Sequence, residues 1–289
     1  MTDPTPPQRV FSPAREEAQT AANQTSSAQT EDPAYRLAFQ DMDFLLREDL
    51  RPVRFQLELL KPELLLDEAK IASTFVFYGS ARIPEPAHAD TLIAAAATDH
   101  QRLIAERLKE KSHYYDESRR LAQLASKSPA NAEGWRQFVV CSGGGPSIME
   151  AANRGAEDVG AESIGLNIVL PHEQLPNPYV TPHLSFQFHY FALRKMHFLL
   201  RARAVAVFPG GFGTFDECFE LLTLIQTGKV SPLPIIFFGR DFWNRVVNWE
   251  ALVEEGVISA ADLDLFSFCE SADEAWDIIR RHYDGGEPA

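Results

Sequence analysis

The chain has 289 residues, of which 45% are apolar and 24% charged, as is typical of a soluble globular protein with one large or two small domains. Its formal net charge of −14 argues against a nucleic-acid-binding surface, because phosphate contacts need dense Lys and Arg. No apolar run reaches the ~18 residues that span a bilayer, and the N-terminus lacks the profile of a secretory signal. We therefore expect a cytoplasmic protein that binds neither membranes nor nucleic acids.

The N-terminal part of the chain divides into two segments. Residues 1–34 are rich in Pro, Thr, Ser, Gln and Ala and have few large apolar side chains, which predicts a disordered tail. Over residues 35–70, leucines recur at the three-to-four spacing of an amphipathic helix, and Pro52 and Pro62 mark breaks. This segment is expected to be a helical extension.

From residue 71 to 285 the pattern alternates between strands and helices. Several expected strands are continuous apolar runs, which indicates a parallel sheet covered on both faces. The expected strands are Thr74–Tyr78, Phe138–Cys141, Ile164–Val169, Leu184–Phe188, Ala204–Phe208 and Ile235–Phe238. The expected helices are Asp90–Lys111, Tyr114–Ser126, Ser147–Val159, Tyr190–Arg201, Thr214–Gly228, Trp243–Glu254 and Ala272–Tyr283. The prediction is an α/β, doubly wound, mostly parallel Rossmann-like sheet with ligands at the carboxyl ends of its strands.

Three of the predicted strands lead into glycine loops suited to an anion. The first loop contains Gly79, Ser80 and Arg82, which offer close backbone approach, a hydroxyl donor and a guanidinium. The second contains Gly143, Gly144 and Gly145 before a proline at a helix start, so that backbone N–H groups lie at the positive end of a helix dipole.

The second loop is not a dinucleotide-binding fingerprint. Ile148 stands where the third glycine belongs, and we therefore expect no NAD. Ser147 and Glu150 have the spacing of a capping box, which predicts a structural role for that carboxylate.

The third loop carries the strongest signal. Gly210, Gly211 and Gly213 let successive N–H groups converge on one anion, and Thr214 adds a hydroxyl where a long helix begins. No Lys follows as in a Walker loop, so a single phosphate fits better than a nucleoside triphosphate with magnesium.

Candidate charged residues lie on either side of the third loop. Glu217 has two interpretations, a catalytic carboxylate or a capping-box partner of Thr214. Arg194 and Lys195 lie in a stretch from Gln174 to Phe215 without an acidic residue, so their surroundings offer no carboxylate and favour a bound anion. The alternative is that both are solvated charges on an amphipathic helix.

The remaining reactive residue types give no sign of a metal or cofactor. The cysteines, Cys141, Cys218 and Cys269, lie far apart in apolar or helical stretches and are expected to be buried and free. The histidines lack metal-ligand spacing and are interpreted as surface or core residues.

In these motifs the sequence resembles the Lonely Guy (LOG) family, which comprises the cytokinin-activating phosphoribohydrolases and their bacterial relatives. The resemblance rests on SGGGPSIMEAANRGA, on the Arg194-Lys195 pair and on PGGFGTFDE followed by LLTLIQTGK, in that order. It covers roughly residues 74–283, and the N-terminal extension resembles the longer bacterial branch.

The resemblance implies hydrolysis of the N-glycosidic bond of a nucleoside 5′-monophosphate, without a cofactor, in a homodimer or larger homo-oligomer. It implies catalytic roles for Arg194 and Glu217 and a phosphate-holding role for the third glycine loop. It also implies substrate contacts by Lys195, Glu173 and Thr223. The segment around Glu173 departs from the plant pattern, which leaves the preferred base open.

Two other functions are weighed beside this one. A non-catalytic binder is the first, since similar proteins include a carrier of the molybdenum cofactor. The second is the lysine decarboxylase description attached to such sequences, for which Lys195 is the one candidate Schiff-base lysine. Retention of both Arg194 and Glu217 favours a hydrolase.

Overall fold

Seven parallel strands form one sheet in the computed structural model, which describes residues 11–171 and 175–283. The strands are β1 (Thr74–Tyr78), β2 (Val139–Ser142), β3 (Ile164–Ile168), β4 (Ser185–Phe188), β5 (Ala202–Val207), β6 (Ile235–Phe238) and β7 (Ser267–Cys269). Their order across the sheet is β4-β3-β2-β1-β5-β6-β7. The predicted doubly wound α/β fold is confirmed.

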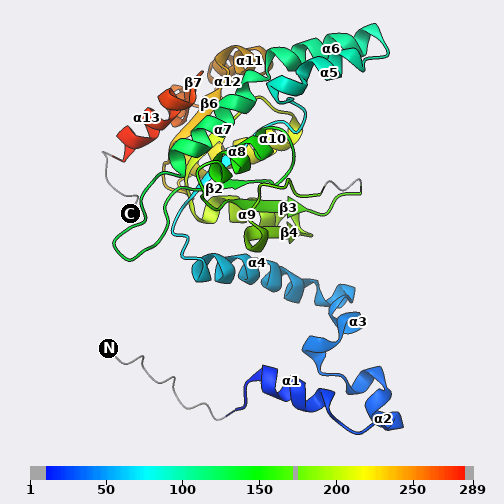
Figure 1. Cartoon of the computed structure of the whole chain (residues 1–289). Coiled ribbons are helices and arrows are strands. Elements are labelled where there is room, and N and C mark those ends of the chain that lie inside the picture. Colours follow the sequence, from blue (N-terminus) through cyan, green and yellow to red (C-terminus); the bar gives the residue numbers. More distant parts are fainter. Residues whose placement is uncertain (1–10, 172–174, 284–289) are drawn as a thin grey trace. The chain divides into compact units, whose positions relative to one another are not determined.

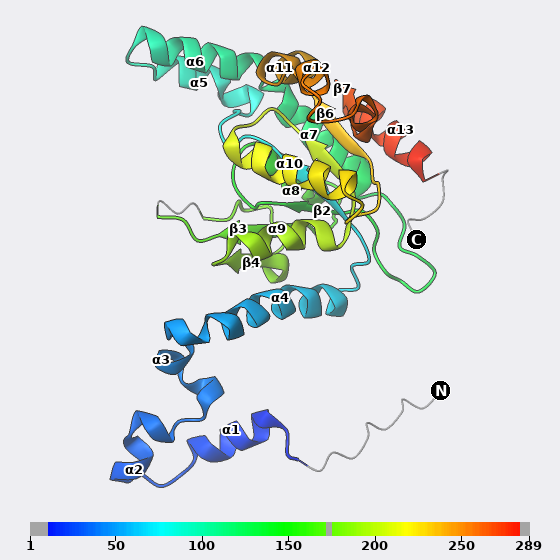
Figure 2. The same ribbon diagram turned by 180° about the vertical axis from the view of Figure 1, so that it is seen from behind.

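Helices cover both faces of the sheet. Figure 1 shows α7 and α8 in front of it, and Figure 2, from behind, shows α9 and α10 in front. The helices of this region are α5 (Ala89–Ala94), α6 (Asp99–Glu110), α7 (His113–Ala125), α8 (Ile148–Glu157), α9 (Phe191–Leu200), α10 (Phe212–Gln226), α11 (Arg240–Val246), α12 (Trp249–Glu254) and α13 (Ala272–His282).

Strand β1 lies at the centre of the core. All of its residues are buried, and Phe75 and Phe77 pack with apolar side chains of α7, α8 and α13. On the opposite face, the Tyr78 ring meets Phe198 of α9 edge-on, with ring centroids 5.2 Å apart. A strand covered on both faces needs the continuous apolar run from which it was predicted.

The sheet reverses its winding direction beside β1. Strands β2, β3 and β4 extend from one side of β1, and the chain then crosses through α9 to β5 on the other side. Loops at such a switch point form a crevice at the carboxyl ends of the strands. Here the loops after β1 and β5 are in contact: the Ser80 N–H of the first donates to the Pro209 carbonyl of the second over 3.1 Å.

The structure differs from the predicted elements in three places. Strand β7 was not predicted, since it has only three residues and Ser267 is exposed. The single helix expected over Asp90–Lys111 is two helices, α5 and α6, because the Thr98 side chain caps a new helix by accepting from the Gln101 N–H. The single helix expected over Trp243–Glu254 is two helices, α11 and α12, because the Asn248 side chain caps a new helix by accepting from the Ala251 N–H.

The N-terminal region also differs from its prediction. Residues 11–34 contain α1 (Ala14–Ala22) and α2 (Ala28–Glu31), where a disordered tail was expected. Neither helix buries a residue, and both rest on local preferences, namely helix-forming Ala, Glu and Gln in α1 and a capping box at Ser27 in α2. Helices α3 (Met42–Leu45) and α4 (Arg51–Glu68) follow.

The chain divides into two compact units, residues 1–58 and 59–289. The boundary therefore falls inside α4 rather than at residue 71, because the second half of α4 has its contacts with the sheet-containing unit. Within the described ranges, no helix is long and apolar enough to cross a membrane.

Candidate active site

Helices α9 and α10 bring Arg194 and Glu217 together. Nη1 of Arg194 donates to Oε1 of Glu217 over 3.1 Å, and the side chains are 11% and 14% exposed. Nε of Arg194 donates to the Leu166 carbonyl at 2.7 Å, and the guanidinium lies 5.0 Å from the centre of the Phe198 ring. The guanidinium is therefore held by a backbone acceptor, an aromatic ring and the carboxylate.

Glu217 does not cap its helix. Helix α10 begins at Phe212, two residues before Thr214, and its N-cap is Gly211, which has no side chain to bond. The Glu217 carboxylate therefore pairs with Arg194 instead, which removes the structural alternative raised by the sequence. Burial raises the pKa of Glu217 to about 7, although the positive charge of Arg194 opposes the shift.

The glycine loop after β5 is shaped around Thr214. A Cβ on Gly210 would lie 2.1 Å from Oγ1 of Thr214, so that only glycine permits this approach. Around Gly211 and Gly213, a Cβ would meet nothing within 4 Å in the described part of the chain. Both glycines are exposed at the start of α10, where helix N–H groups lack intrahelical acceptors. The loop thus has open space at the positive end of a long helix.

The loop after β2 approaches the same guanidinium. A Cβ on Gly143 would lie 2.6 Å from Nη2 of Arg194. The carbonyls of Gly144 and Gly145 accept hydrogen bonds from Asn177, from its backbone N–H at 2.8 Å and its side chain at 3.0 Å. Asn177 thus holds the loop after β2 in place through Gly144 and Gly145, while Gly143 lies against the Arg194 guanidinium.

The loop after β1 makes fewer contacts with the candidate site than the loops after β2 and β5. The Ser80 hydroxyl accepts from the Arg82 N–H at 3.0 Å, and the Arg82 side chain is exposed. Gly79 packs against the Ile148 side chain. Ser80 links this loop to the β5 loop, because its N–H donates to the Pro209 carbonyl.

Lys195 is occupied by carboxylates. Its Nζ lies 2.9 Å from Oδ1 of Asp216 and 3.0 Å from Oε2 of Glu220, both on α10. The expectation that Arg194 and Lys195 lack acidic partners is wrong, because the acids that follow residue 215 fold back onto α9. Burial alone would lower the pKa of Lys195, but the hydrogen bonds to both carboxylates outweigh it and raise the pKa.

Three other predictions have different outcomes. Glu173 lies outside the described residues. Thr223 is exposed, bonds to the Phe219 carbonyl of its own helix at 2.8 Å, and lies about 9 Å along the axis from Glu217. The capping box of Ser147 and Glu150 is wrong: Ser147 has φ +67° and donates to the Ile83 carbonyl, while Glu150 accepts from the Tyr115 hydroxyl at 3.0 Å.

Sequence reasoning missed the polar residues behind the loops. The Asn177 amide also donates to Asn153, which accepts from the Ser142 hydroxyl at 2.7 Å, and all three residues are buried. Buried amides need such partners, yet nothing in the chain order pairs residues this far apart. The other missed contact is the Leu166 carbonyl, a backbone group that leaves no trace in the sequence.

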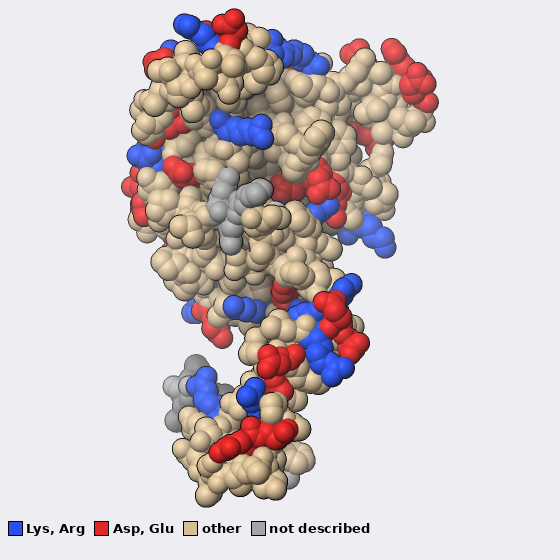
Figure 3. All heavy atoms as spheres, turned by 90° about the vertical axis from the view of Figure 1, so that its right-hand side faces the viewer, with Lys and Arg blue, Asp and Glu red and all other residues tan. Residues whose placement is uncertain are grey.

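The surface at the carboxyl ends of β3 and β4 is not dominated by basic side chains. In Figure 1 the arrows of β3 and β4 point toward the right, and Figure 3 views that side of the molecule. Acidic and basic side chains are interspersed there among uncharged ones. A bound anion would therefore be held by a few placed groups rather than by a broad potential.

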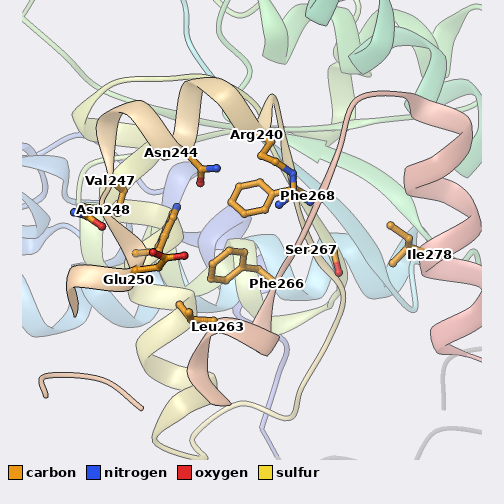
Figure 4. Close-up of a pocket in the computed structure, with 11 residues that line it drawn as sticks. Arg240, Asn244, Val247, Asn248, Glu250, Leu263, Phe266, Ser267, Phe268 and Ile278 are labelled. Carbon is orange, nitrogen blue, oxygen red and sulfur yellow. The ribbon is translucent and has the colours of Figure 1, made fainter. Parts of the chain in front are cut away.

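A separate pocket lies beside β7. It has a volume of about 750 Å³ and is lined by residues that include Arg240, Phe266 and Phe268 (Figure 4). None of its lining residues is a predicted site residue.

Among the described residues, no group of three or more His, Cys, Asp or Glu side chains could hold a metal ion. The three cysteines are buried and free, as predicted.

Comparison with known proteins adds a family match over α8 to α13. A family model described as "Possible lysine decarboxylase" matches residues 149–279, which include Arg194 and Glu217. The chain is 26% identical over 140 residues to "Probable cytokinin riboside 5'-monophosphate phosphoribohydrolase LOG4" of Oryza sativa subsp. japonica. That alignment covers 47% of this chain and 59% of the relative.

Two solved structures are similar in outline. The structural-genomics protein TM1055 is 19% identical, with a TM-score of 0.45 over 72% of this chain and 99% of that one. The molybdenum cofactor carrier protein of Chlamydomonas reinhardtii is 16% identical, with a TM-score of 0.41 over 72% of this chain and 97% of that one. At these values neither says anything about the activity of this chain.

Proposed function

We propose that this chain is a member of the Lonely Guy (LOG) family and that it hydrolyses the N-glycosidic bond of a nucleoside 5′-monophosphate; the family match and the similarity to a phosphoribohydrolase support this. The products are the free base and ribose 5-phosphate. The observation that carries the proposal is the buried pair of Arg194 and Glu217, 3.1 Å apart, beside an open glycine loop at a helix N-terminus.

The glycine loop supplies the binding of the phosphate. The free N–H groups at the start of α10 and the Thr214 hydroxyl suit one tetrahedral anion. Binding energy from the phosphate, which does not react, fixes the ribose against the catalytic groups. Gly143 leaves room for the Arg194 guanidinium beside it.

Glu217 supplies the carboxylate that glycosidic cleavage needs. Departure of the base leaves an oxocarbenium-like centre at C1′, which a nearby carboxylate stabilises, and a water must then be oriented and deprotonated. A pKa of about 7 suits a general base at neutral pH. Arg194 orients the carboxylate through one nitrogen while Leu166 fixes the guanidinium through another.

The lysine decarboxylase description fits the site less well. A Schiff-base lysine must lose its proton, and enzymes lower its pKa for that purpose. The pKa of Lys195 is instead raised by hydrogen bonds to Asp216 and Glu220 that outweigh its burial. The ion pairs of Lys195 favour a role in joining α9 to α10.

A panel of nucleotides tests the proposal. The purified chain is incubated separately with AMP, GMP, CMP and prenylated AMP, and the free base is separated by chromatography. Release of the base from at least one of them is expected, and the relative rates identify the preferred base. Failure to cleave all four would leave a nucleotide-binding protein as the better description.

A further inference from the structure

Helix α9 depends on other helices to balance its charge. Its basic side chains include Arg194 and Lys195, and it contains no acidic residue of its own. On one side, α10 supplies Glu217 to Arg194, and Asp216 and Glu220 to Lys195. The rest of the basic residues on this segment are paired by a helix that precedes the sheet.

Helix α4 provides that second set of carboxylates. Arg201, the C-cap of α9, donates to Oε2 of Glu63 at 2.9 Å, to Oδ1 of Asp67 at 2.7 Å and to the Ile71 carbonyl at 2.5 Å. Nδ1 of His197 lies 3.6 Å from Oε1 of the same Glu63. Contact with His197 and then with Arg201 holds the pKa of Glu63 at about 2, against the opposing effect of burial.

These contacts fall on the helix face that carries Arg194. His197 is three residues and Arg201 seven residues after Arg194, so their side chains share one side of α9. The His197 side chain is 1% exposed, and its ring lies 5.3 Å from that of Phe188. Glu63 thus contacts α9 at two successive turns below Arg194, and it restricts both rotation and sliding of the helix.

We propose that Glu63 is a positioning residue, which holds α9 in the register that aligns Arg194 with Glu217. The end of α4 would then be part of the active enzyme and not only an added layer. This inference rests on the function proposed above. Its physical basis is that Arg194 must meet the Leu166 carbonyl and Glu217 at once, at 2.7 and 3.1 Å, and a displaced helix cannot satisfy both.

The test compares Glu63→Gln with a matched control. Glu63→Gln keeps the size of the side chain and removes its charge, and we expect kcat for AMP to fall roughly 10- to 100-fold with little change in KM. Hydrogen exchange of the α9 amides should become faster. Asp158→Asn removes a similarly buried carboxylate that pairs with Arg119 of α7, and it is expected to change neither kcat nor α9 exchange.

The values of kcat and of α9 hydrogen exchange in these variants decide whether Glu63 positions the helix. Unchanged kcat and unchanged α9 exchange in folded Glu63→Gln would overturn the proposal, as would an equal loss of kcat in Asp158→Asn. If Glu63→Gln does not fold, Asp67→Asn, which removes only the more exposed partner of Arg201, should give the same changes to a smaller degree. If wild type cleaves no nucleotide, the proposed function fails, and the exchange of α9 still decides whether Glu63 holds this helix.

Discussion

Nη1 of Arg194 lies 3.1 Å from Oε1 of Glu217, and the two side chains come from different helices at the switch point of the sheet. Both side chains are largely buried, and this burial raises the pKa of the Glu217 carboxyl to about 7. Perturbed carboxyls next to a basic partner are common at catalytic sites.

Replacement of the Glu217 carboxylate distinguishes a catalytic role from a structural one. Glu217→Gln should lower kcat for AMP by roughly 10²- to 10⁴-fold, because the amide can neither deprotonate water nor carry negative charge. The thermal unfolding midpoint at pH 8 should not fall, since a buried carboxyl with a raised pKa opposes folding once it is ionised. Glu220→Gln, one turn further along α10, is the control and should keep its activity, because Asp216 still pairs with Lys195. Lost stability with retained activity in Glu217→Gln would contradict the catalytic role.

The pH dependence of the reaction follows from the same pKa. Glu217 acts in its ionised form, and its pKa is raised from 4.5 to about 7. We therefore expect kcat/KM to rise with pH and to level off above about pH 7. Initial rates between pH 5 and pH 9 measure this profile. A rate that is flat from about pH 5 upward would mean that no group with this pKa takes part.

Arg194 sets the position of that profile. Its positive charge lowers the pKa of Glu217 against the effect of burial. In Arg194→Gln the midpoint of the remaining activity should therefore move to higher pH. Arg194→Lys retains the charge but cannot donate to Leu166 and Glu217 from two nitrogens, so kcat should fall with a smaller shift of the midpoint. Equal midpoints in all three proteins would contradict the pairing.

The glycine loop offers a contrast between two single-methyl changes. Gly210→Ala places a methyl 2.1 Å from the Thr214 hydroxyl, so the loop must shift and the unfolding midpoint should fall. In Gly213→Ala the added methyl would meet no other part of the described chain within 4 Å, and the variant should fold as well as wild type. If the phosphate occupies that open space, Gly213→Ala should still raise KM for AMP. Thermal unfolding and steady-state kinetics of both variants test this, and an unchanged KM in Gly213→Ala would place the phosphate elsewhere.

The sequence was most informative where the local pattern and the tertiary structure agree. Strand β1 was predicted residue for residue because a strand covered on both faces must be apolar throughout. Strand β7 escaped prediction because a three-residue edge strand has no such run. Helices α1 and α2 were not predicted because a segment with few apolar residues favours disorder, whereas alanine content and local capping suffice for short helices.

The sequence named the candidate residues Arg194 and Glu217 but did not predict that they pair with each other. Glycine loops at strand ends pointed to the Arg194 and Glu217 region because parallel strands place those ends at one edge. The spacing of Thr214 and Glu217 suited a capping box equally well, and only the start of α10 at Phe212 decides between the two. The partners of Lys195 lie on a neighbouring helix, and that contact depends on how α9 packs against α10.

The products formed from AMP distinguish hydrolysis of the N-glycosidic bond from every other reaction of this nucleotide. Purified wild-type protein and Glu217→Gln are incubated with AMP, and adenine, ribose 5-phosphate, adenosine and inorganic phosphate are each quantified by mass spectrometry. We expect adenine and ribose 5-phosphate in equal amounts from wild type and almost none of either from Glu217→Gln. Intact AMP, or adenosine with inorganic phosphate, would contradict this expectation.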